Sequence, residues 1–416
     1  MDTPSLFARN SDSKKIWAVS GALLIVGFGA GFFAEAAVAR HRGYSLSTDV
    51  PAGVDMAPVW KAWNVLDEKF VPDAVASTSP LATTTEAQNQ NRVWGMIAGM
   101  AASLNDPYTF FLPPQQAQAF NDDMSGSFQG VGMEIEVKNQ ILTVVSPLKG
   151  NPAEKAGIKT GDQILKINDA DTKGMDVTQA VTKIRGPKNT QVRLLILRSG
   201  WDSPREFKVV RDVISVPIVN TIARKDGVFV ISVATFTSSA PDLFRNALRE
   251  FVLSGDTRLV LDLRGNPGGY LDAAVSMASW FIPGGSIIVT EDYDGHQSSV
   301  VHRSLGYDAF TKNLKMAILV DKGSASASEI LSDALRHYGV AKMIGTNTYG
   351  KGVVQELVEI TPETSLKVTV ARWLGPDGLQ IPHTGLIPDI VATTSDELIK
   401  AGKDVQMDAA VRYLLQ

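Results

Sequence analysis

The chain has 416 residues, of which 44% are hydrophobic and 20% are charged. This balance is typical of a packed globular protein and excludes a mainly disordered or collagen-like chain; the length allows two or three domains of roughly 100–200 residues. Forty Lys and Arg residues against 44 Asp and Glu residues give a formal charge of −4, without the basic excess expected of a nucleic-acid-binding protein. The absence of cysteine excludes disulfides and thiolate catalysis, and no two of the five histidines have a tight metal-ligand spacing, so we expect no metal site.

Residues 16–34 form an uncharged apolar run close to the N-terminus. A helix of this length spans about 28 Å, close to the thickness of the hydrocarbon core of a bilayer. Basic residues flank the run on both sides, and their slight excess before it favours a cytoplasmic N-terminus. Small residues over 34–39 also offer sites for signal cleavage, so a secreted or periplasmic protein is the alternative to an uncleaved anchor. The run is longer than a usual signal core, which favours the anchor.

Two helical patterns follow the apolar run. Apolar residues recur at helical spacing over 59–66 and again over 93–104, ahead of a loop at 105–108. The sequence therefore predicts a small helical N-terminal unit, bounded by a stretch rich in Gly and Ser at 124–131.

Short strands and turns characterise residues 130–211. Alternating and apolar runs predict strands and short helices here; the strands are 133–137, 141–145, 163–167 and 192–198, and the helices are 152–156 and 177–184. Three segments resemble a PDZ domain, namely GVGM (130–133), NPAEKAGIKTGDQILKIND (151–169) and IRGPKNTQVRLLILR (184–198).

Strands and helices alternate from residue 228 onward. Strands are predicted at 228–233, 258–263, 315–320, 353–360 and 366–374, and helices around 243–251, 271–282 and 326–339. This alternation predicts an α/β layer whose loops gather at the ends of the strands, where active sites form.

Three loops that contain glycine lie at these strand ends: the glycine loop (265–269), the Ser326 loop (323–329) and the Lys351 loop (345–352). The Lys351 loop is close to the nucleotide-binding pattern GxxxxGK[ST]. Gly352 stands where that pattern needs a hydroxyl, and a strand rather than a helix follows, so nucleotide binding is disfavoured. An ordinary exposed lysine is the simpler alternative.

The Ser326 loop, GSASASE, brings three serines to the start of a helix that directly follows a buried strand. A serine at this position has an exposed hydroxyl, and the next backbone N–H is unpaired at the positive end of the helix dipole. Acyl transfer needs a nucleophile and an oxyanion site of this kind. Simple helix capping by serine is the alternative.

A serine nucleophile needs a base, and no histidine lies beside an evident carboxylate that would orient it. Lys351 offers a Ser-Lys pair instead. For that role burial must lower the pKa of the lysine from about 10.4 by about three units, at a cost of roughly 4 kcal/mol. A carboxylate that touched Lys351 would keep the amine charged and would exclude this mechanism.

Several motifs together resemble the carboxyl-terminal processing (tail-specific) peptidases: DPYTFFLPP (106–114), DLRGNPGGYL (262–271), SASASEILSDALRHYG (324–339), GTNTYGKGVVQ (345–355) and IPHTGLIPDI (381–390). The resemblance covers about residues 55–416. It implies that Ser326 is the nucleophile, that Lys351 is the general base and that Gln355 orients the lysine. It also implies that the backbone N–H groups of Gly268 and Ala327 bind the oxyanion.

Other residues of these motifs have supporting or structural roles by the same resemblance. Glu329, Thr348 and Gly269 occupy supporting positions. His337 stands where some members carry an acidic residue, and we interpret it as structural.

The PDZ resemblance implies capture of a substrate's terminal carboxylate by the backbone N–H groups of Gly130, Val131 and Gly132. Val131 and Met133 are expected to line an apolar pocket, which predicts a preference for apolar C-termini. A turn eased by glycine at the start of a strand is the alternative for GVGM.

We therefore predict a mixed α/β (α+β) protease core with an inserted PDZ domain and a small helical N-terminal unit, preceded by one transmembrane helix. The predicted boundaries are a cytoplasmic tail 1–15, an anchor or signal segment 16–39, a linker and helical unit 43–125, a PDZ domain 126–212 and a peptidase core 213–416.

The predicted function is a membrane-anchored Ser-Lys endopeptidase, extracytoplasmic, that recognises protein C-termini and needs no cofactor. Its expected partners are protein or peptide substrates with apolar C-termini and the membrane, with an adaptor or a second copy of the chain left open. A catalytically silent membrane-anchored PDZ scaffold is the alternative.

Overall fold

The computed structural model describes residues 50–71, 84–138, 140–175, 177–215, 217–307, 309–310, 314–393, 398 and 403–416. The predicted tail 1–15 and anchor 16–39 lie outside these residues, so the anchor stays a prediction. Within the residues described, every helix is too short or too polar to cross a membrane. The chain divides into two compact units, 1–83 and 84–416.

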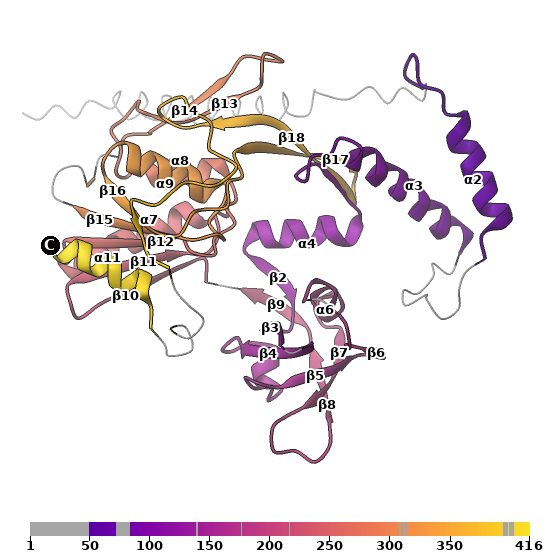
Figure 1. Ribbon diagram of the computed structural model, residues 1–416. Coiled ribbons are helices and arrows are strands. Elements are labelled where there is room, and N and C mark those ends of the chain that lie inside the picture. Colours follow the sequence, from indigo (N-terminus) through magenta and orange to yellow (C-terminus); the bar gives the residue numbers. More distant parts are fainter. Residues whose placement is uncertain are drawn as a thin grey trace, which may run out of the picture. The chain divides into compact units, whose positions relative to one another are not determined.

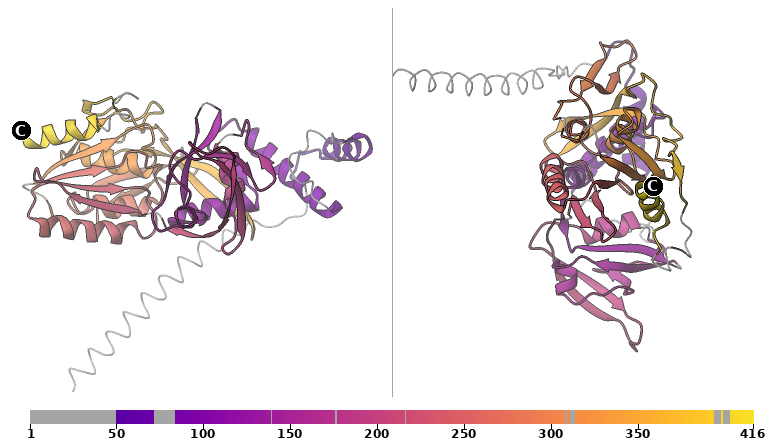
Figure 2. Two further views of the ribbon diagram at one scale, coloured as in Figure 1. Left: turned by 90° about the horizontal axis from the view of Figure 1, so that it is seen from below. Right: turned by 90° about the vertical axis from the view of Figure 1, so that its left-hand side faces the viewer.

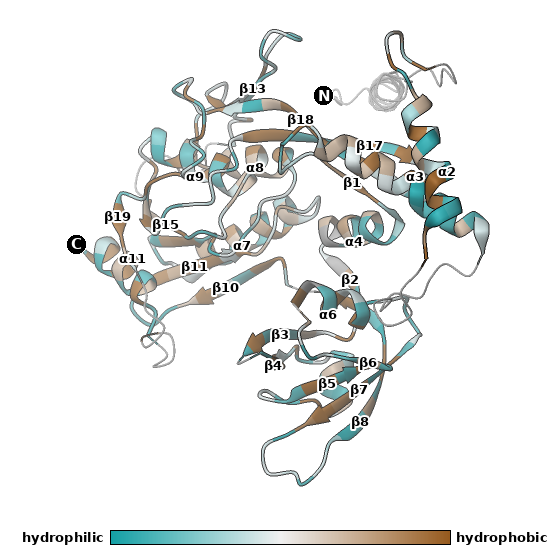
Figure 3. Cartoon of the chain, turned by 45° about the vertical axis from the view of Figure 1, so that its right-hand side comes forward, coloured by the Kyte–Doolittle hydropathy of each residue, from teal (hydrophilic) through white to brown (hydrophobic). Residues whose placement is uncertain are grey.

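The described part of the first unit contains the helix α2 (Ala57–Lys69), which confirms the helix predicted at 59–66. Pro58 lies in its first turn, where a missing backbone N–H costs nothing. None of its residues is buried, and Trp60 and Trp63 lie edge to face with their ring centroids 6.5 Å apart. Figure 3 shows both hydrophobic and hydrophilic residues along this helix.

The second unit begins with α3 (Thr85–Ala102), which the Thr84 side chain caps by accepting a hydrogen bond from the Ala87 N–H. The strand β1 (Phe110–Leu112) follows and pairs antiparallel with β18 (Thr364–Leu374) of the core. The predicted boundary of a linker and helical unit at 43–125 stays a prediction. Its last part also contributes a strand to a core sheet, in which Phe111 and Leu112 are buried.

The helix α4 (Pro114–Ser125) leads into the predicted PDZ domain. Its main sheet is antiparallel in the order β3-β4-β5-β7-β8, with β6 beside β5, while β2 pairs with β9. The strands are β2 (Ser127–Gly130), β3 (Met133–Lys138), β4 (Ile141–Pro147), β5 (Gln163–Ile167), β6 (Ala170–Asp171), β7 (Gln191–Leu197), β8 (Arg205–Val210) and β9 (Asp212–Ser215), and the helices are α5 (Pro152–Lys155) and α6 (Val177–Ile184). The predicted strands and helices of this region agree with these elements to within two residues. Alternate residues of β7 are buried, as expected of a strand with one face on a core.

The predicted peptidase core is built on a six-stranded sheet in the order β10-β11-β12-β15-β16-β19, parallel except for β10 (Figure 1). Its strands are β10 (Val219–Ala223), β11 (Val228–Val233), β12 (Arg258–Asp262), β15 (Lys315–Val320), β16 (Ala341–Gly345) and β19 (Ile390–Val391). The helices of the core within the described residues are α7 (Ala240–Ser254), α8 (Leu271–Ala278), α9 (Ala327–His337) and α11 (Val405–Leu415).

Helices cover both faces of this sheet, which explains why its central strands are continuous apolar runs. Phe229 and Ile231 of β11 belong to the hydrophobic cluster formed with α7, α8 and α9, whereas Val228 and Val230 belong to the cluster formed with α11. The left view of Figure 2 shows α11 and α7 on opposite sides of the sheet. The apolar run predicted as the strand 228–233 is confirmed.

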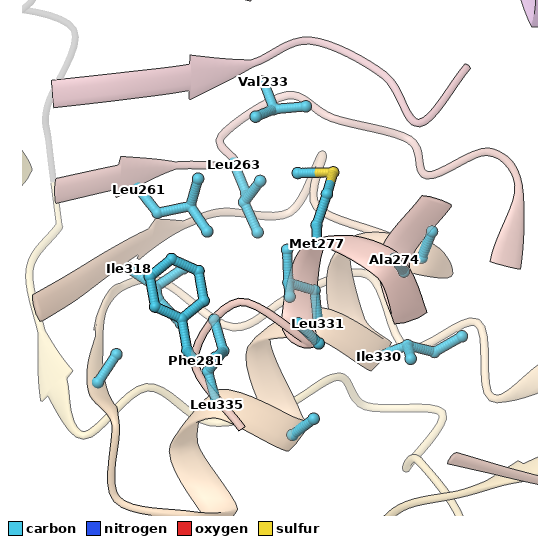
Figure 4. Packing of buried hydrophobic residues seen from close by; sticks show 14 of the residues in the cluster. Val233, Leu261, Leu263, Ala274, Met277, Phe281, Ile318, Ile330, Leu331 and Leu335 are labelled. Atoms are coloured by element: carbon cyan, nitrogen blue, oxygen red, sulfur yellow. The ribbon is translucent and has the colours of Figure 1, made fainter. Parts of the chain in front are cut away.

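The larger cluster fixes the strand ends that carry the loops. Figure 4 shows Leu261 and Ile318 of adjacent strands packed near Met277, Phe281 and Leu331. Each of these side chains is at least 98% buried, and burial of such a residue contributes about 1.5–3 kcal/mol. The loops after β12 and β15 therefore start from rigid positions.

A second sheet has the order β1-β18-β13-β14, with β17 also paired to β18; its further strands are β13 (Ile287–Asp292), β14 (Val300–Arg303) and β17 (Val353–Thr361). The Lys351 loop runs from β16 directly into β17. This confirms that a strand, and not a phosphate-binding helix, follows the loop.

Candidate active site

Ser326 occupies the N-cap position of α9 with a strained backbone, at φ 54° and ψ −114°. A capping serine usually has an extended backbone, so helix capping alone does not account for this conformation. A positive φ at a residue other than glycine costs of order 1–3 kcal/mol and persists only where neighbouring contacts enforce it. Ala327 is the first residue of α9, and its N–H lies in the turn whose amides have no partner within the helix.

Glu329 joins the loop of the candidate nucleophile to the loop of the candidate base. Its side chain is fully buried, and its Oε2 accepts hydrogen bonds from the backbone N–H of Ser326 and of Lys351, both at 3.0 Å. Its Oε1 accepts from the Thr348 hydroxyl at 2.6 Å and from the Gly350 N–H at 2.8 Å. One carboxylate thus fixes the main chain on both sides of the site.

The glycine loop and the Ser326 loop are also tied directly to each other. The Ser324 hydroxyl donates to the Leu263 carbonyl at 2.8 Å. The Asn266 carbonyl accepts from the Ala325 N–H at 3.0 Å and from the Ser328 hydroxyl at 2.9 Å. The three serines of the sequence motif therefore have different roles. Ser328 binds the glycine loop, Ser324 binds the residue at the end of the strand before it, and Ser326 alone has the strained backbone.

Gly268 lies against the candidate nucleophile, as the sequence predicts. Its φ is 101°, and a Cβ at this position would lie 2.8 Å from the Ser326 Cβ, so only glycine fits. Its N–H, however, donates to Asn266 Oδ1 at 2.9 Å, and the amide of Asn266 is oriented by a second bond from Nδ2 to the Val233 carbonyl. In this conformation the Gly268 N–H is occupied by the bond to Asn266, and the oxyanion role expected of Gly268 stays a prediction. The sequence signal that was missed is a buried Asn inside the glycine loop.

Lys351 lies in an environment that suits a base. Burial lowers the pKa of Lys351 to about 8; the positive charge of Lys367 also lowers it, while the Glu329 carboxylate acts in the opposite direction. Within the described residues, the Lys351 ammonium makes no ion pair, as the base role requires. In the conformation described, Lys351 Nζ and Ser326 Oγ are not hydrogen-bonded to each other.

Lys367 is a second half-buried lysine near the site, which sequence reasoning missed. It lies on β18 opposite Phe110, and its Nζ is 5.4 Å from the ring centroid of Phe110 and 5.0 Å from that of Phe120. Burial lowers the pKa of Lys367 as well. Aromatic faces attract a cation without neutralising it, so Lys367 keeps a like charge close to Lys351.

Gln355 lies on β17 opposite Thr369 of β18. Among the residues that the structure describes, its buried Nε2 has no hydrogen-bond partner, which costs about 1–3 kcal/mol. The orienting role expected of Gln355 stays a prediction, because this conformation brings no partner to that amide.

The turn at 106–109 is hydrogen-bonded to β18, which brings this early segment of the chain close to the site. The Asp106 carboxylate accepts from the Tyr108 N–H at 3.1 Å and from the Thr109 hydroxyl at 2.6 Å, and Thr109 Oγ1 accepts from the Thr369 N–H at 3.0 Å. Burial and, after it, the neighbouring phenol of Tyr349 raise the pKa of Tyr108. The motif DPYT thus places Tyr108 next to the Lys351 loop, a location that the sequence alone did not indicate.

The predicted peptide-binding segment begins the edge strand β3, which pairs only with β4 among the described strands. Gly132 has a φ of 69°, and a Cβ there would lie 2.5 Å from the Asn151 Cβ. Gly130 precedes Val131, whose side chain is only 2% exposed in the core of this domain. Met133 is half-buried on the same core, and the apolar pocket expected beside Val131 and Met133 stays a prediction.

No group of three or more His, Asp or Glu side chains in the described residues could hold a metal ion. His337 is exposed in the last turn of α9, eleven residues beyond Ser326. This corresponds to about 16 Å along a helix. We keep the interpretation of His337 as structural.

Comparisons with known proteins match two parts of the chain to known families. Residues 227–392 match Peptidase family S41, and residues 121–197 match the PDZ domain family. The chain is 37% identical over 302 residues to the carboxy-terminal processing protease CtpA of Bacillus subtilis, and 39% identical over 298 residues to a probable CtpA-like serine protease of Staphylococcus aureus. These alignments cover 73% and 72% of this chain but only 64% and 59% of the relatives. The solved structure of a photosystem II D1 C-terminal processing protease aligns with a TM-score of 0.51 at 25% identity, over 86% of this chain and 96% of that one.

Proposed function

Because the chain belongs to the PDZ-containing C-terminal processing serine peptidases of family S41, we propose that it is an endopeptidase that uses Ser326 and Lys351. The observation that carries this proposal is the single Glu329 oxygen that binds the backbone N–H of both residues. The depressed pKa of Lys351, about 8, supports a base that is partly neutral near physiological pH.

The chemistry follows from these groups. The neutral Lys351 amine accepts the Ser326 proton as Oγ attacks the peptide carbonyl, and the Ala327 N–H donates to the resulting oxyanion. The lysine ammonium then protonates the leaving amine, which leaves an ester on Ser326. Lys351 next takes a proton from water, which attacks the ester. The lysine ammonium returns this proton to Ser326 Oγ as the ester bond breaks and the acid is released. In this scheme Gln355 directs the lone pair of the lysine toward Ser326.

Substrate binding is expected to complete the contact between Ser326 Oγ and Lys351 Nζ. Catalytic hydrogen bonds are often long in ligand-free enzymes and tighten in the substrate complex. The Gln355 Nε2 has no partner among the described residues, and this supports a site whose side chains complete their hydrogen bonds only when the substrate binds.

The PDZ domain supplies the proposed recognition of protein C-termini. Strand β3 is an edge strand to which an extended peptide can add, and Gly130–Gly132 immediately precede it. The backbone N–H groups of this segment would bind the terminal carboxylate, with Met133 beside the last apolar side chain.

A peptide that ends in a free carboxylate and small apolar residues is expected to be cleaved faster than the same peptide with an amidated C-terminus. Loss of one charge-assisted hydrogen bond costs on the order of 1.5–3 kcal/mol, or about ten- to a hundredfold in kcat/KM. Met133→Asp should have a similar effect, because its charge would repel the carboxylate. The measurement is kcat/KM for the two peptides, with Ser326→Ala as the blank.

Equal cleavage of the two peptides would contradict tail recognition and leave a general endopeptidase. The alternative of a catalytically silent scaffold makes a different prediction. It would bind the free peptide more tightly than the amidated one but would give the same zero turnover as Ser326→Ala.

We also propose that residues 16–39 anchor the chain in a membrane with residues 43–416 on the extracytoplasmic side, since the uncharged run is long enough to span a bilayer. The full chain should then sediment with membranes and resist extraction by high salt, while the chain without residues 1–42 should stay in the supernatant. Salt extraction of the full chain would contradict the anchor.

A further inference from the structure

The first turn of α11 is connected by hydrogen bonds to the segments that lead into the glycine loop and the Lys351 loop. This helix packs on the face of the sheet opposite α7, α8 and α9. Asp404 caps it by accepting a hydrogen bond from the Met407 N–H at 3.0 Å. The proposed catalytic steps involve no residue of this helix.

Arg264 connects this turn to the glycine loop, which begins at the next residue. The two terminal nitrogens of its guanidinium donate to the two carboxylate oxygens of Asp404 at 2.8 and 2.9 Å. The same guanidinium makes a second bidentate pair with Asp262, at 2.9 and 2.7 Å. The Arg264 side chain is only 22% exposed, and bidentate charge-assisted pairs fix geometry strongly.

The connection continues from Arg264 to the nucleophile. The N–H of Gly265 donates to Asp321 Oδ1 at 2.8 Å, and the same oxygen accepts from the Gly323 N–H at 2.9 Å. Gly323 begins the loop that carries Ser326. A shift of Arg264 would therefore displace the glycine loop and the Ser326 loop together.

Gln406 makes the second connection, to the loop of the base. Its Nε2 donates to the Ala392 carbonyl at 3.1 Å, and the Ala392 N–H donates to the Gly345 carbonyl at 2.8 Å. Gly345 begins the Lys351 loop. Gln406 Oε1 also accepts from Arg264 at 3.2 Å, so the two connections share one hydrogen-bond network.

We propose that Asp404 and Gln406, at the start of the C-terminal helix, are positioning residues that hold the glycine loop and the Lys351 loop at their catalytic separation. The inference rests on the proposed function of Ser326 and Lys351. Asp404 acts through Arg264, and Gln406 acts through Ala392; neither residue touches the substrate.

Asp404→Asn tests the proposal with little risk to the helix, because Asn caps a helix about as well as Asp. The variant loses the negative charge that pairs with Arg264. Its kcat should fall roughly three- to tenfold while its KM stays the same within about twofold. The rate at which a small fluorophosphonate labels Ser326 should fall by the same factor, because that reagent bypasses peptide binding. Asp404→Glu keeps the charge and should recover most of the activity.

Arg258→Met is the matched control. Arg258 lies at the opposite end of β12 and donates to the carbonyl of Leu414 at 3.0 Å, so it also fastens α11 but adjoins no catalytic loop. The kcat of Arg258→Met should stay within about twofold of that of the unaltered chain, even if the melting temperature of the variant is lower.

An unchanged kcat in Asp404→Asn would overturn the proposal. So would losses of activity in Asp404→Asn and Arg258→Met that follow their melting temperatures, since α11 would then only stabilise the fold. Retention of turnover by Ser326→Ala in the same assay would instead refute the proposed function, so the two failures are distinguishable.

Discussion

Ser326→Ala and Lys351→Ala are each expected to abolish peptide cleavage, with a loss of about 10⁴-fold or more in kcat, and the double variant should be no worse than either single one. The nucleophile and the base act as one unit, so removal of one partner leaves the other without a function. Lys351→Arg should be equally inactive, because a guanidinium stays protonated throughout the usable pH range. The measurement is kcat for all four variants, with circular dichroism to establish that each is folded.

Lys322→Ala is the matched control for loss of a positive charge near the site. Lys322 is exposed and directly precedes the Ser326 loop, so its removal should change kcat by less than about twofold. Appreciable turnover by Lys351→Ala at neutral pH would remove Lys351 from the base role, whatever the result for Ser326→Ala.

Glu329→Gln is expected to lower both stability and activity, although the two side chains have nearly the same shape. The Glu329 carboxylate accepts four hydrogen bonds, and the side-chain NH₂ of Gln would face two of those donors. A buried donor left without a partner costs about 1–3 kcal/mol, so the free energy of unfolding should fall by about 2–6 kcal/mol. The kcat of the folded variant should fall at least about tenfold, because a misplacement of about 1 Å between catalytic groups has effects of this size or larger.

Chemical denaturation and turnover measured on the same preparation test this expectation. Glu359→Gln makes the same chemical change at an exposed position of β17 and should leave both quantities nearly unchanged. A Glu329→Gln variant that is as stable and as active as the unaltered chain would show that the shared carboxylate does not set the geometry of the site.

The elements that the sequence predicted well are those with strong local patterns. The apolar runs of β11 and β15 were predicted to the residue, because strands covered on both faces need no partner information to be recognised. The helix predicted over 271–282 ends at Ala278, where the Ser279 hydroxyl binds the Val275 carbonyl.

Several of the elements that were missed lie at sheet edges or on the outside of the core, and their residues are defined by tertiary contacts. Strand β10 is largely exposed, and α11 has only a narrow buried stripe. The three-residue strand β1 is too short for any local pattern, and it exists because β18 offers a pairing edge.

The candidate site divides in the same way. Ser326 and Lys351 were predicted from residue chemistry and family resemblance, and each lies on a loop at the end of a core strand. The detailed contacts were not predictable. Nothing in the sequence indicates that the Asn266 side chain occupies the Gly268 N–H, or that Lys367 brings a second charge to the base from another sheet.

The pH dependence of Ser326 labelling by a small fluorophosphonate tests the central claim most directly, because it reports the nucleophile and its base without peptide binding or product release. The labelling rate should rise through one ionisation near pH 8, the pKa that burial and Lys367 give to Lys351, since only the neutral amine accepts the proton. Lys367→Gln should move this ionisation to higher pH, because removal of a like charge makes protonation of Lys351 easier. A rate that is flat from about pH 6 to 9, or that rises through an ionisation near 6.5 as expected of histidine, would contradict the assignment of Lys351 as the base.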